Sequence, residues 1–166
     1  MAESTVRADG NGNTCPIIEV GCGNGRLAFH LQHYDVLIEA TDDKSWCLHK
    51  KIGETSAKVH NLDHAQAVQK FQPTIVICAW MPSYKAAFRK QDTMQEYILI
   101  GPSYAGMCGH LWDTWGGHAA ETATPRYQKD GFTRKSLTAL EKLQLCRHDG
   151  PTKMFGSQTV SFRRTG

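Results

Sequence analysis

The feature that most constrains the fold is a short apolar run that ends in an acid and three closely spaced glycines. Residues 15–20 form the run and include Glu19, glycines follow at positions 21, 23 and 25, and a helical pattern of apolar residues begins at Leu27. This order is typical of a buried parallel strand, a tight turn and the start of a helix. Glycine adopts positive φ without strain and lets a ligand approach the backbone closely. The N–H groups and positive dipole end of the helix face the same turn, so the sequence predicts a ligand site there.

The spacing of the glycines indicates which ligand class fits the turn. A dinucleotide-binding turn has the pattern G-x-G-x-x-G, in which the third glycine lets the helix pack close to the strand. Counted from Gly21, that third position is Arg26, and the third glycine comes one residue earlier, at Gly25. The pattern is therefore E-x-G-x-G-x-G, which disfavours a dehydrogenase. A glycine-rich loop without a ligand remains the alternative.

Length and charge limit the number of domains and the classes of partner that the sequence can indicate. At 166 residues the chain fits one domain, which we expect at residues 15–166 after a flexible tail at 1–14. The net charge of +3 does not establish a nucleic-acid partner, and pairs such as Arg134-Lys135 and Arg163-Arg164 are expected to be solvated surface. No signal-peptide core and no apolar run of roughly 20 residues is present, so we expect a soluble, intracellular and most simply cytoplasmic protein without membrane contact.

The cysteines and histidines do not form a recognisable metal motif. A C-x-H spacing occurs at Cys47, Cys108 and Cys146, whereas structural zinc sites bring their ligands in pairs two to four residues apart. We therefore predict no metal site.

Apolar patterning predicts alternating strands and helices after the glycine turn. Strands are expected at 36–40, 57–60, within 73–82, at 96–100, 143–147 and 158–163, and helices at 25–33, 44–51, 65–71, 85–91 and 133–143. The run within 73–82 is β-branched and apolar, as a central parallel strand buried on both faces requires. The long segment 103–130, rich in glycine, tryptophan and histidine, follows the fifth strand and should overhang the carboxyl edge of the sheet.

Acids follow the second and third predicted strands. In nucleoside-binding α/β sheets, a carboxylate at the end of the second strand accepts hydrogen bonds from ribose hydroxyls, about 20 residues after the glycines. Asp42 lies near that interval, and Glu39 is a rival inside the strand. Asp42 or Asp43 could instead cap the following helix, and of the two we favour Asp43 as the cap. Asp63 follows the third strand and could equally be a helix cap.

The glycine pattern with its downstream acids resembles the Rossmann-like (class I) S-adenosylmethionine (SAM) dependent methyltransferases, over almost the whole chain from Cys15 onward. The resemblance implies an α/β fold: a seven-stranded, mostly parallel sheet with helices on both faces and a C-terminal antiparallel hairpin. It implies SAM as cofactor. The implied cofactor-binding residues are Glu19, Gly21, Cys22, Gly23, Asn24, Gly25, Asp42, Asp43, Asp63 and Ala79, with Asp63 facing the adenine.

The resemblance is incomplete after the fourth strand. Enzymes of the family that methylate amino groups carry Asn/Asp-Pro-Pro-aromatic there, but this chain has Ala79-Trp80-Met81-Pro82. Methylation of an amide or an adenine amino group is therefore not implied. The candidate substrate-binding residues are aromatic: Trp80, Tyr84, Trp112 and Trp115. The last two could equally pack their loop onto the sheet.

The sequence does not single out a catalytic residue. Tyr84, Asp113, His64 and His110 are candidate bases, and none is preferred. The expected function is SAM-dependent methyl transfer to an unidentified protein, RNA or small molecule, with S-adenosylhomocysteine as product. The alternative is a non-catalytic binding or assembly module with the methyltransferase fold, favoured by the missing polar residue and the short N-terminus.

Overall fold

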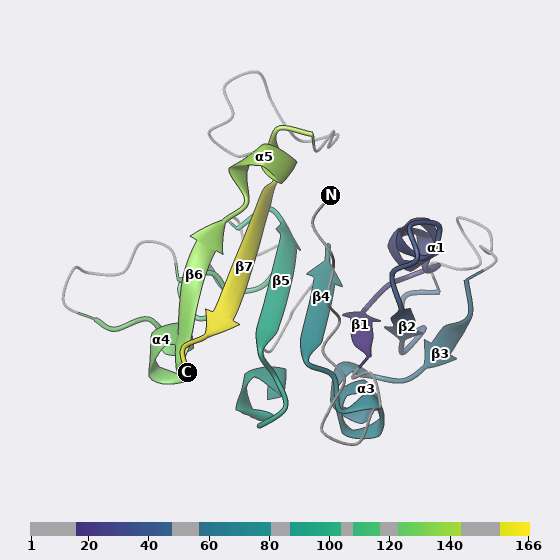
Figure 1. Cartoon of the computed structure of the whole chain (residues 1–166), viewed down its shortest axis with the longest axis horizontal. Helices are drawn as coiled ribbons and strands as arrows, with labels where there is room; N and C mark the ends of the chain where they lie inside the picture. Colours follow the sequence, from purple (N-terminus) through teal and green to yellow (C-terminus); the bar gives the residue numbers. More distant parts are fainter. Residues whose placement is uncertain (1–15, 48–56, 81–86, 104–107, 117–122, 144–156) are drawn as a thin grey trace.

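The fold is built on one mixed seven-stranded sheet. A computed structural model of the chain describes residues 16–47, 57–80, 87–103, 108–116, 123–143 and 157–166. The strand order is β3-β2-β1-β4-β5-β7-β6 (Figure 1). The strands are β1 (Ile17–Val20), β2 (Ile38–Asp42), β3 (Val59–Asn61), β4 (Ile75–Ala79), β5 (Glu96–Gly101), β6 (Phe132–Ser136) and β7 (Gln158–Arg164).

Strands β1 to β5 are parallel, and β7 pairs antiparallel with both β5 and β6. The chain therefore forms the predicted mostly parallel sheet with an antiparallel C-terminal pair. The strand order reverses between β1 and β4. In open α/β sheets, ligands bind at the carboxyl ends of the strands beside such a reversal.

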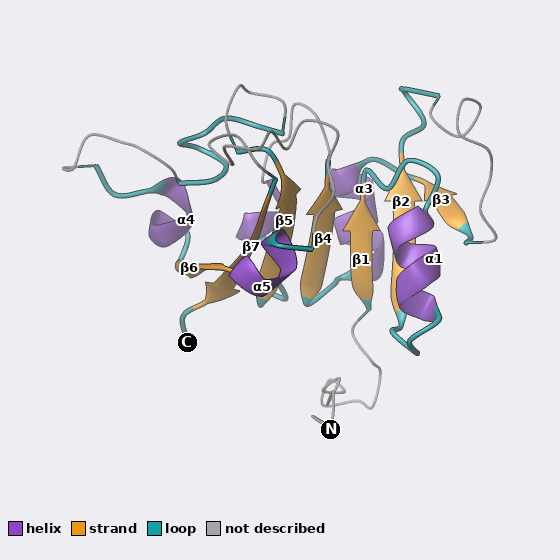
Figure 2. Cartoon of the chain, turned by 90° about the horizontal axis from the view of Figure 1, so that it is seen from above, coloured by secondary structure: helices purple, strands orange, loops and turns teal. Residues whose placement is uncertain are grey.

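Helical segments lie on both faces of the sheet, as predicted. The segments are α1 (Arg26–Gln32), α3 (His64–Phe71), the 3₁₀ turn η1 (Ala87–Lys90), α4 (Arg126–Lys129) and α5 (Thr138–Glu141). Figure 2 shows α1 and α5 in front of the sheet and α3 behind it. Burial on both faces explains the β-branched and apolar residues of β1 and β4.

Two groups of buried side chains stabilise the sheet. The larger one lies on the α3 face and joins Ile18 and Val76 to aromatic residues of the C-terminal half, among them Tyr97 and Phe162. The smaller one lies under α1 and contains Ala28, Ile38 and Ala40. Their small side chains let α1 pack close to β1 and β2, which fixes the position of the glycine turn between strand and helix.

The predicted helix 133–143 is wrong. Residues 132–136 instead form β6, in which Phe132 is buried and Thr133 and Lys135 are exposed. This alternation has the period of a strand, and only Thr138–Glu141 is helical. The partner of β7 is therefore β6 rather than the predicted strand 143–147, of which residues 144–147 lie outside the described part.

Two other predicted helices need correction. The first four residues of predicted helix 44–51 form a turn, and residues 48–56 lie outside the described part. Lys44 and Cys47 have φ values of 58° and 51°, which a right-handed helix does not allow. Within predicted helix 85–91, the described residues form only the 3₁₀ turn η1.

Candidate functional site

The glycine turn after β1 has the left-handed backbone that its sequence predicts. The φ values are 63° at Gly21, 60° at Gly23 and 76° at Gly25. A side chain at such a position costs about 1–2 kcal/mol because its Cβ approaches the following carbonyl. Three alternating left-handed residues therefore strongly favour glycine. Cys22 and Asn24 between them are half-buried.

Glu19 holds the start of α1 in place. Its carboxylate accepts a hydrogen bond from the Ala28 N–H at 3.0 Å, and the residue is only 2% exposed. The residue at the N-cap of α1 is Gly25, which has no side chain to bond the first turn. Glu19 therefore supplies from β1 the acceptor that an N-terminal helix cap would otherwise provide.

Burial changes the acidity of Glu19. Loss of solvation raises the pKa of this carboxyl from 4.5 to about 7, with a smaller upward contribution from Asp42, while the Ala28 hydrogen bond opposes the shift. The pKa of the neighbouring Cys22 thiol is also raised, first by burial and then by the charges of Glu19 and Asp42. Cys22 is therefore a neutral thiol rather than a nucleophile.

Asp42 joins the end of β2 to the glycine turn. One carboxylate oxygen, Oδ2, accepts a hydrogen bond from the Gly23 N–H at 2.9 Å, and Oδ1 accepts one from the Lys44 N–H at 2.7 Å. Each oxygen of an ionised carboxylate has a second lone pair. Asp42 can therefore hold the turn and also accept hydrogen bonds from a ligand.

Its rival, Glu39, is engaged elsewhere. Its carboxylate lies 2.8 Å from the His60 ring nitrogen Nε2, and the His60 ring contacts Phe71 of α3. Asp43 is exposed and accepts a hydrogen bond from the Ser45 N–H at 2.9 Å. Hydrogen bonds to Ser45 lower the pKa of Asp43. Asp43 thus closes a local turn and does not cap a described helix.

Asp63 is the N-cap of α3. Its Oδ1 atom accepts hydrogen bonds from the N–H groups of Ala65 and Gln66, each at 2.8 Å, and the Gln66 side chain bonds back to the Asp63 N–H. This is a complete capping box. The cap that the sequence allows for Asp63 is therefore present. Both bonds use the same oxygen, so Oδ2 retains acceptor capacity.

Trp80 has an unusual backbone at the end of β4. It follows Ala79, its φ is 55°, and its N–H donates to the Ile100 carbonyl at 2.9 Å. A bulky residue in the left-handed region is a strained outlier that the surrounding structure must hold, and such outliers cluster at functional sites. The Trp80 residue is 40% exposed at the carboxyl edge. The sequence indicates Trp80 as a candidate substrate-binding residue but gives no signal of its left-handed backbone.

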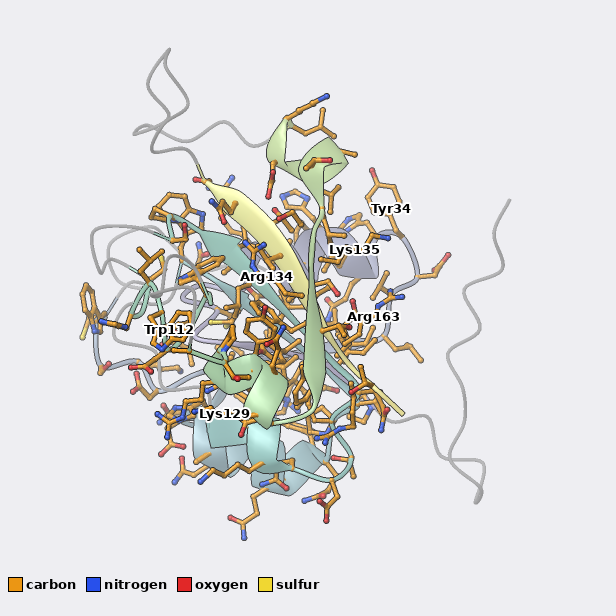
Figure 3. The ribbon with its side chains drawn as sticks, turned by 90° about the vertical axis from the view of Figure 1, so that its left-hand side faces the viewer. Tyr34, Trp112, Lys129, Arg134, Lys135 and Arg163 are labelled. Carbon is orange, nitrogen blue, oxygen red and sulfur yellow. The ribbon has the colours of Figure 1, made fainter. Side chains whose placement is uncertain are left out.

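The two tryptophans of the long loop differ. Trp115 is 1% exposed, and its ring N–H donates to the Cys108 carbonyl at 2.8 Å. It therefore packs the loop onto the sheet, which is the second of the two roles that the sequence allows, and it does not line a substrate pocket. Trp112 is half-buried, and Figure 3 shows it on the side of the molecule that carries β6. Tyr84 lies outside the described residues.

The other candidate bases do not converge on the glycine turn through any described bond. His110 is exposed and lies 3.6 Å from Asp113, and His64 is the half-buried first residue of α3. Among the residues that the structure describes, no group of three or more His, Cys, Asp or Glu is arranged to hold a metal ion. None of the described helices combines the length and apolar character needed to cross a membrane.

One residue that the sequence analysis missed shapes the same edge. Gly101 ends β5 with a φ of 142°, and an added Cβ would lie 2.9 Å from the Cys108 sulfur and 3.8 Å from the Trp80 Cα. Because Gly101 has no side chain, Cys108 of the 108–116 segment and Trp80 at the end of β4 can both lie close to it. The Gly101-Pro102 dipeptide is the signal that could have indicated this position.

Comparison with known proteins identifies the fold. No protein-family profile and no curated protein sequence matches the chain. A Listeria monocytogenes protein assigned as an S-adenosylmethionine-dependent methyltransferase is similar in structure at 11% identity, with 92% of each chain covered and a TM-score of 0.51. The methyltransferase domain of bacterial CtHen1 is similar at 15% identity, with coverage of 92% of this chain and 90% of the other and a TM-score of 0.54. The chain has the class I methyltransferase fold.

Within this methyltransferase fold, the predicted residues meet at one edge of the sheet. The glycine turn, Asp42, Asp63 and Trp80 follow β1, β2, β3 and β4, which are parallel and adjacent. A hydrogen bond directly connects Gly23 with Asp42, whereas Asp63 bonds within α3 and the Trp80 N–H donates to Ile100 of β5.

Proposed function

We propose that this protein binds SAM at the glycine turn and transfers its methyl group to an acceptor that enters beside β4. The observation that carries the proposal is the turn of three left-handed glycines, hydrogen-bonded to Asp42 beside the reversal in strand order. A loop that only joins a strand to a helix has no need for three left-handed residues and a bridging carboxylate. Similarity in fold to SAM-dependent methyltransferases supports the same assignment.

The backbone turn and the carboxylates around it fit a sulfonium nucleoside. The glycine turn would admit the methionine part of SAM, with Cys22, Asn24 and Ala79 beside it. Asp42 would accept hydrogen bonds from the ribose hydroxyls through its remaining lone pairs. Asp63 Oδ2 would accept a hydrogen bond from the adenine amino group while Oδ1 caps α3. Glu19 would act as a positioning residue, because it is buried and holds the turn through α1.

SAM supplies an activated methyl group whose transfer leaves the neutral thioether S-adenosylhomocysteine. The protein must hold the acceptor atom about 3–3.5 Å from that methyl carbon and in line with the breaking bond. Trp80 would present its ring to an acceptor at this edge. Its side chain cannot remove a proton, so this position suits an acceptor that needs no base there.

Calorimetry with two matched glycine variants tests the proposal. We expect micromolar binding of SAM and S-adenosylhomocysteine and no binding of NAD. Gly23→Ala should weaken SAM binding by about tenfold, because the strained turn moves its N–H away from Asp42. Gly131→Ala is the control, since Gly131 has a φ of 80° and an added Cβ there would contact nothing within 4 Å. Equal SAM affinity in the two variants would contradict the site.

A second candidate is a non-catalytic module that keeps the fold. The observation that favours it is Trp80, an exposed apolar residue where amino-methylating relatives carry Asn or Asp. Incubation of a cell extract with SAM carrying a labelled methyl group separates the two. Transfer of label that requires Gly23 supports the enzyme, and SAM binding without transfer to any acceptor supports the module.

A further inference from the structure

The described C-terminal residues are strongly basic. Residues 123–143 and 157–166 contain seven Lys or Arg and two Asp or Glu, whereas the described residues from 16 to 80 contain four and six. Both C-terminal acids are engaged: Asp130 lies 3.1 Å from the buried Arg89, and Glu141 accepts a hydrogen bond from the Thr159 N–H. The positive charge of this region is therefore not neutralised by its own acids.

The fold brings basic residues that are distant in the sequence to one edge of the sheet. Strand β6 is the edge strand, and its register places Thr133 opposite Arg163 and Lys135 opposite Ser161. Lys135 and Arg163 are thus diagonal neighbours on one face. Figure 3 looks onto this edge and shows Lys129, Arg134, Lys135 and Arg163 on it.

Four of the basic residues are available to a partner. They are exposed, and none forms an ion pair with another described residue: Arg126, Lys129, Lys135 and Lys142. By contrast, Arg163 pairs with Glu96 at 3.1 Å. Arg134 donates to the Trp115 carbonyl and to Gln158. We call the four available residues the basic edge.

The basic edge leads toward the proposed methyl-donor site. It runs from α4, before β6, along β6 to Lys142 at the end of α5. Strand β6 is antiparallel to β7, which is antiparallel to β5, so β6 ends at the same edge as the parallel strands. Trp80 is 40% exposed at that edge. Strands β5 and β7 lie between β4, which Trp80 follows, and β6. Exposed cations and an exposed aromatic ring separated along one sheet edge suit a chain of phosphates with unpaired bases, since bases stack on aromatic rings.

We propose that the basic edge binds the phosphate backbone of a single-stranded nucleic acid and directs it toward Trp80. The four cations are spread over α4, β6 and the end of α5. A strand of repeating phosphates can meet them at unequal spacings, whereas an acidic protein would have to match them individually. The binding itself is independent of methyl transfer. The further statement that this nucleic acid is the methyl acceptor rests on the proposed function.

Fluorescence anisotropy with a labelled single-stranded RNA of mixed sequence, measured across a salt series, tests the binding. Lys129→Ala combined with Lys135→Ala removes two phosphate contacts. It should reduce the slope of log affinity against log salt by about 1.4, and weaken binding at low salt by at least about tenfold. The matched control is Lys58→Ala combined with Lys70→Ala, which removes two exposed lysines of the β3 and α3 region at the opposite end of the sheet. The control should match the wild type.

The outcomes separate the alternatives. Single-stranded DNA of the same sequence in a parallel series shows whether the sugar matters, and a reduced slope with either polymer supports the proposal. Equal losses in the two double variants, no RNA binding by the wild type at low salt, or better competition by polyglutamate than by unlabelled RNA would overturn it. Calorimetry with SAM on the same preparations keeps the tests distinct, because SAM binding without RNA binding rejects only this inference. RNA binding without SAM binding rejects only the proposed function.

Discussion

The two halves of the sheet are built in different ways. The half with β3, β2 and β1 packs aliphatic residues under α1, such as Ala28, Ile38 and Ala40, and carries Asp42, Asp43 and Asp63 at the carboxyl edge. The half with β5, β7 and β6 packs aromatic rings: Tyr97 is stacked on Phe162 with ring centroids 4.5 Å apart. In the first half, the aliphatic packing lets helix, turn and strand approach closely. In the second half, the aromatic packing buries large rings and supports a long loop and the basic edge.

We propose that the two halves bind different ligands. The half with the glycine turn and its carboxylates would bind the sulfonium nucleoside, and the basic half would bind an anionic nucleic acid. If the halves are separable, a substitution in one half should leave ligand binding in the other half intact.

The largest effect is expected in the aromatic half. Trp115→Ala removes a fully buried ring and its hydrogen bond to the Cys108 carbonyl. It should lower the free energy of unfolding by about 3–5 kcal/mol in chemical denaturation. Trp112→Ala, at a half-buried position of the same loop, should cost about 1 kcal/mol and serves as the control. If the halves are separable, folded Trp115→Ala keeps its SAM affinity; a large loss of that affinity would show that they are coupled.

The next effect is a pH dependence of stability that arises from Glu19, in the half with β1, β2 and β3. Between pH 4.5 and about 7, the folded Glu19 carboxyl holds a proton that the unfolded one has released. The folded state then binds more protons, so stability falls as pH rises through this window, by about 3 kcal/mol in total. Glu19→Gln should remove this decrease while still offering an acceptor to Ala28. Denaturation curves at pH 5 and pH 8 measure it, and an identical pH dependence in wild type and variant would contradict the assignment.

The smallest effect separates two roles of one residue. Asp63→Ala should cost about 1 kcal/mol of stability through loss of the α3 cap. Asp63→Asn should keep the cap but weaken SAM binding a few-fold, because its amide is a poorer acceptor for the adenine amino group. Thermal unfolding and calorimetry on both variants measure the two roles. Unchanged SAM affinity in Asp63→Asn would leave Asp63 as a helix cap alone.

The parallel half of the molecule could be predicted from the amino-acid sequence. Apolar β-branched runs, three glycines at fixed spacing and acids at strand ends are local signals, and each marks one element or turn. They predicted the fold class, the left-handed turn and an acid, Asp42, at the end of the second strand. The strand order and the hydrogen bond between Gly23 and Asp42 came from the structure.

The antiparallel half and the details of the site depend on tertiary packing that local sequence signals do not contain. Residues 132–136 carry a pattern that leucines downstream made to look helical, and pairing with β7 overrode it. Burial of Glu19, strain at Trp80 and the packing of Trp115 depend on residues far apart in the chain. The basic edge also depends on the tertiary structure: Lys129, Lys135 and Lys142 are near in sequence, but they line one edge because β6 is an outermost strand of the sheet. Whether a side chain is buried or exposed is decided when the strands pair, and the pairing joins residues that are far apart in the sequence.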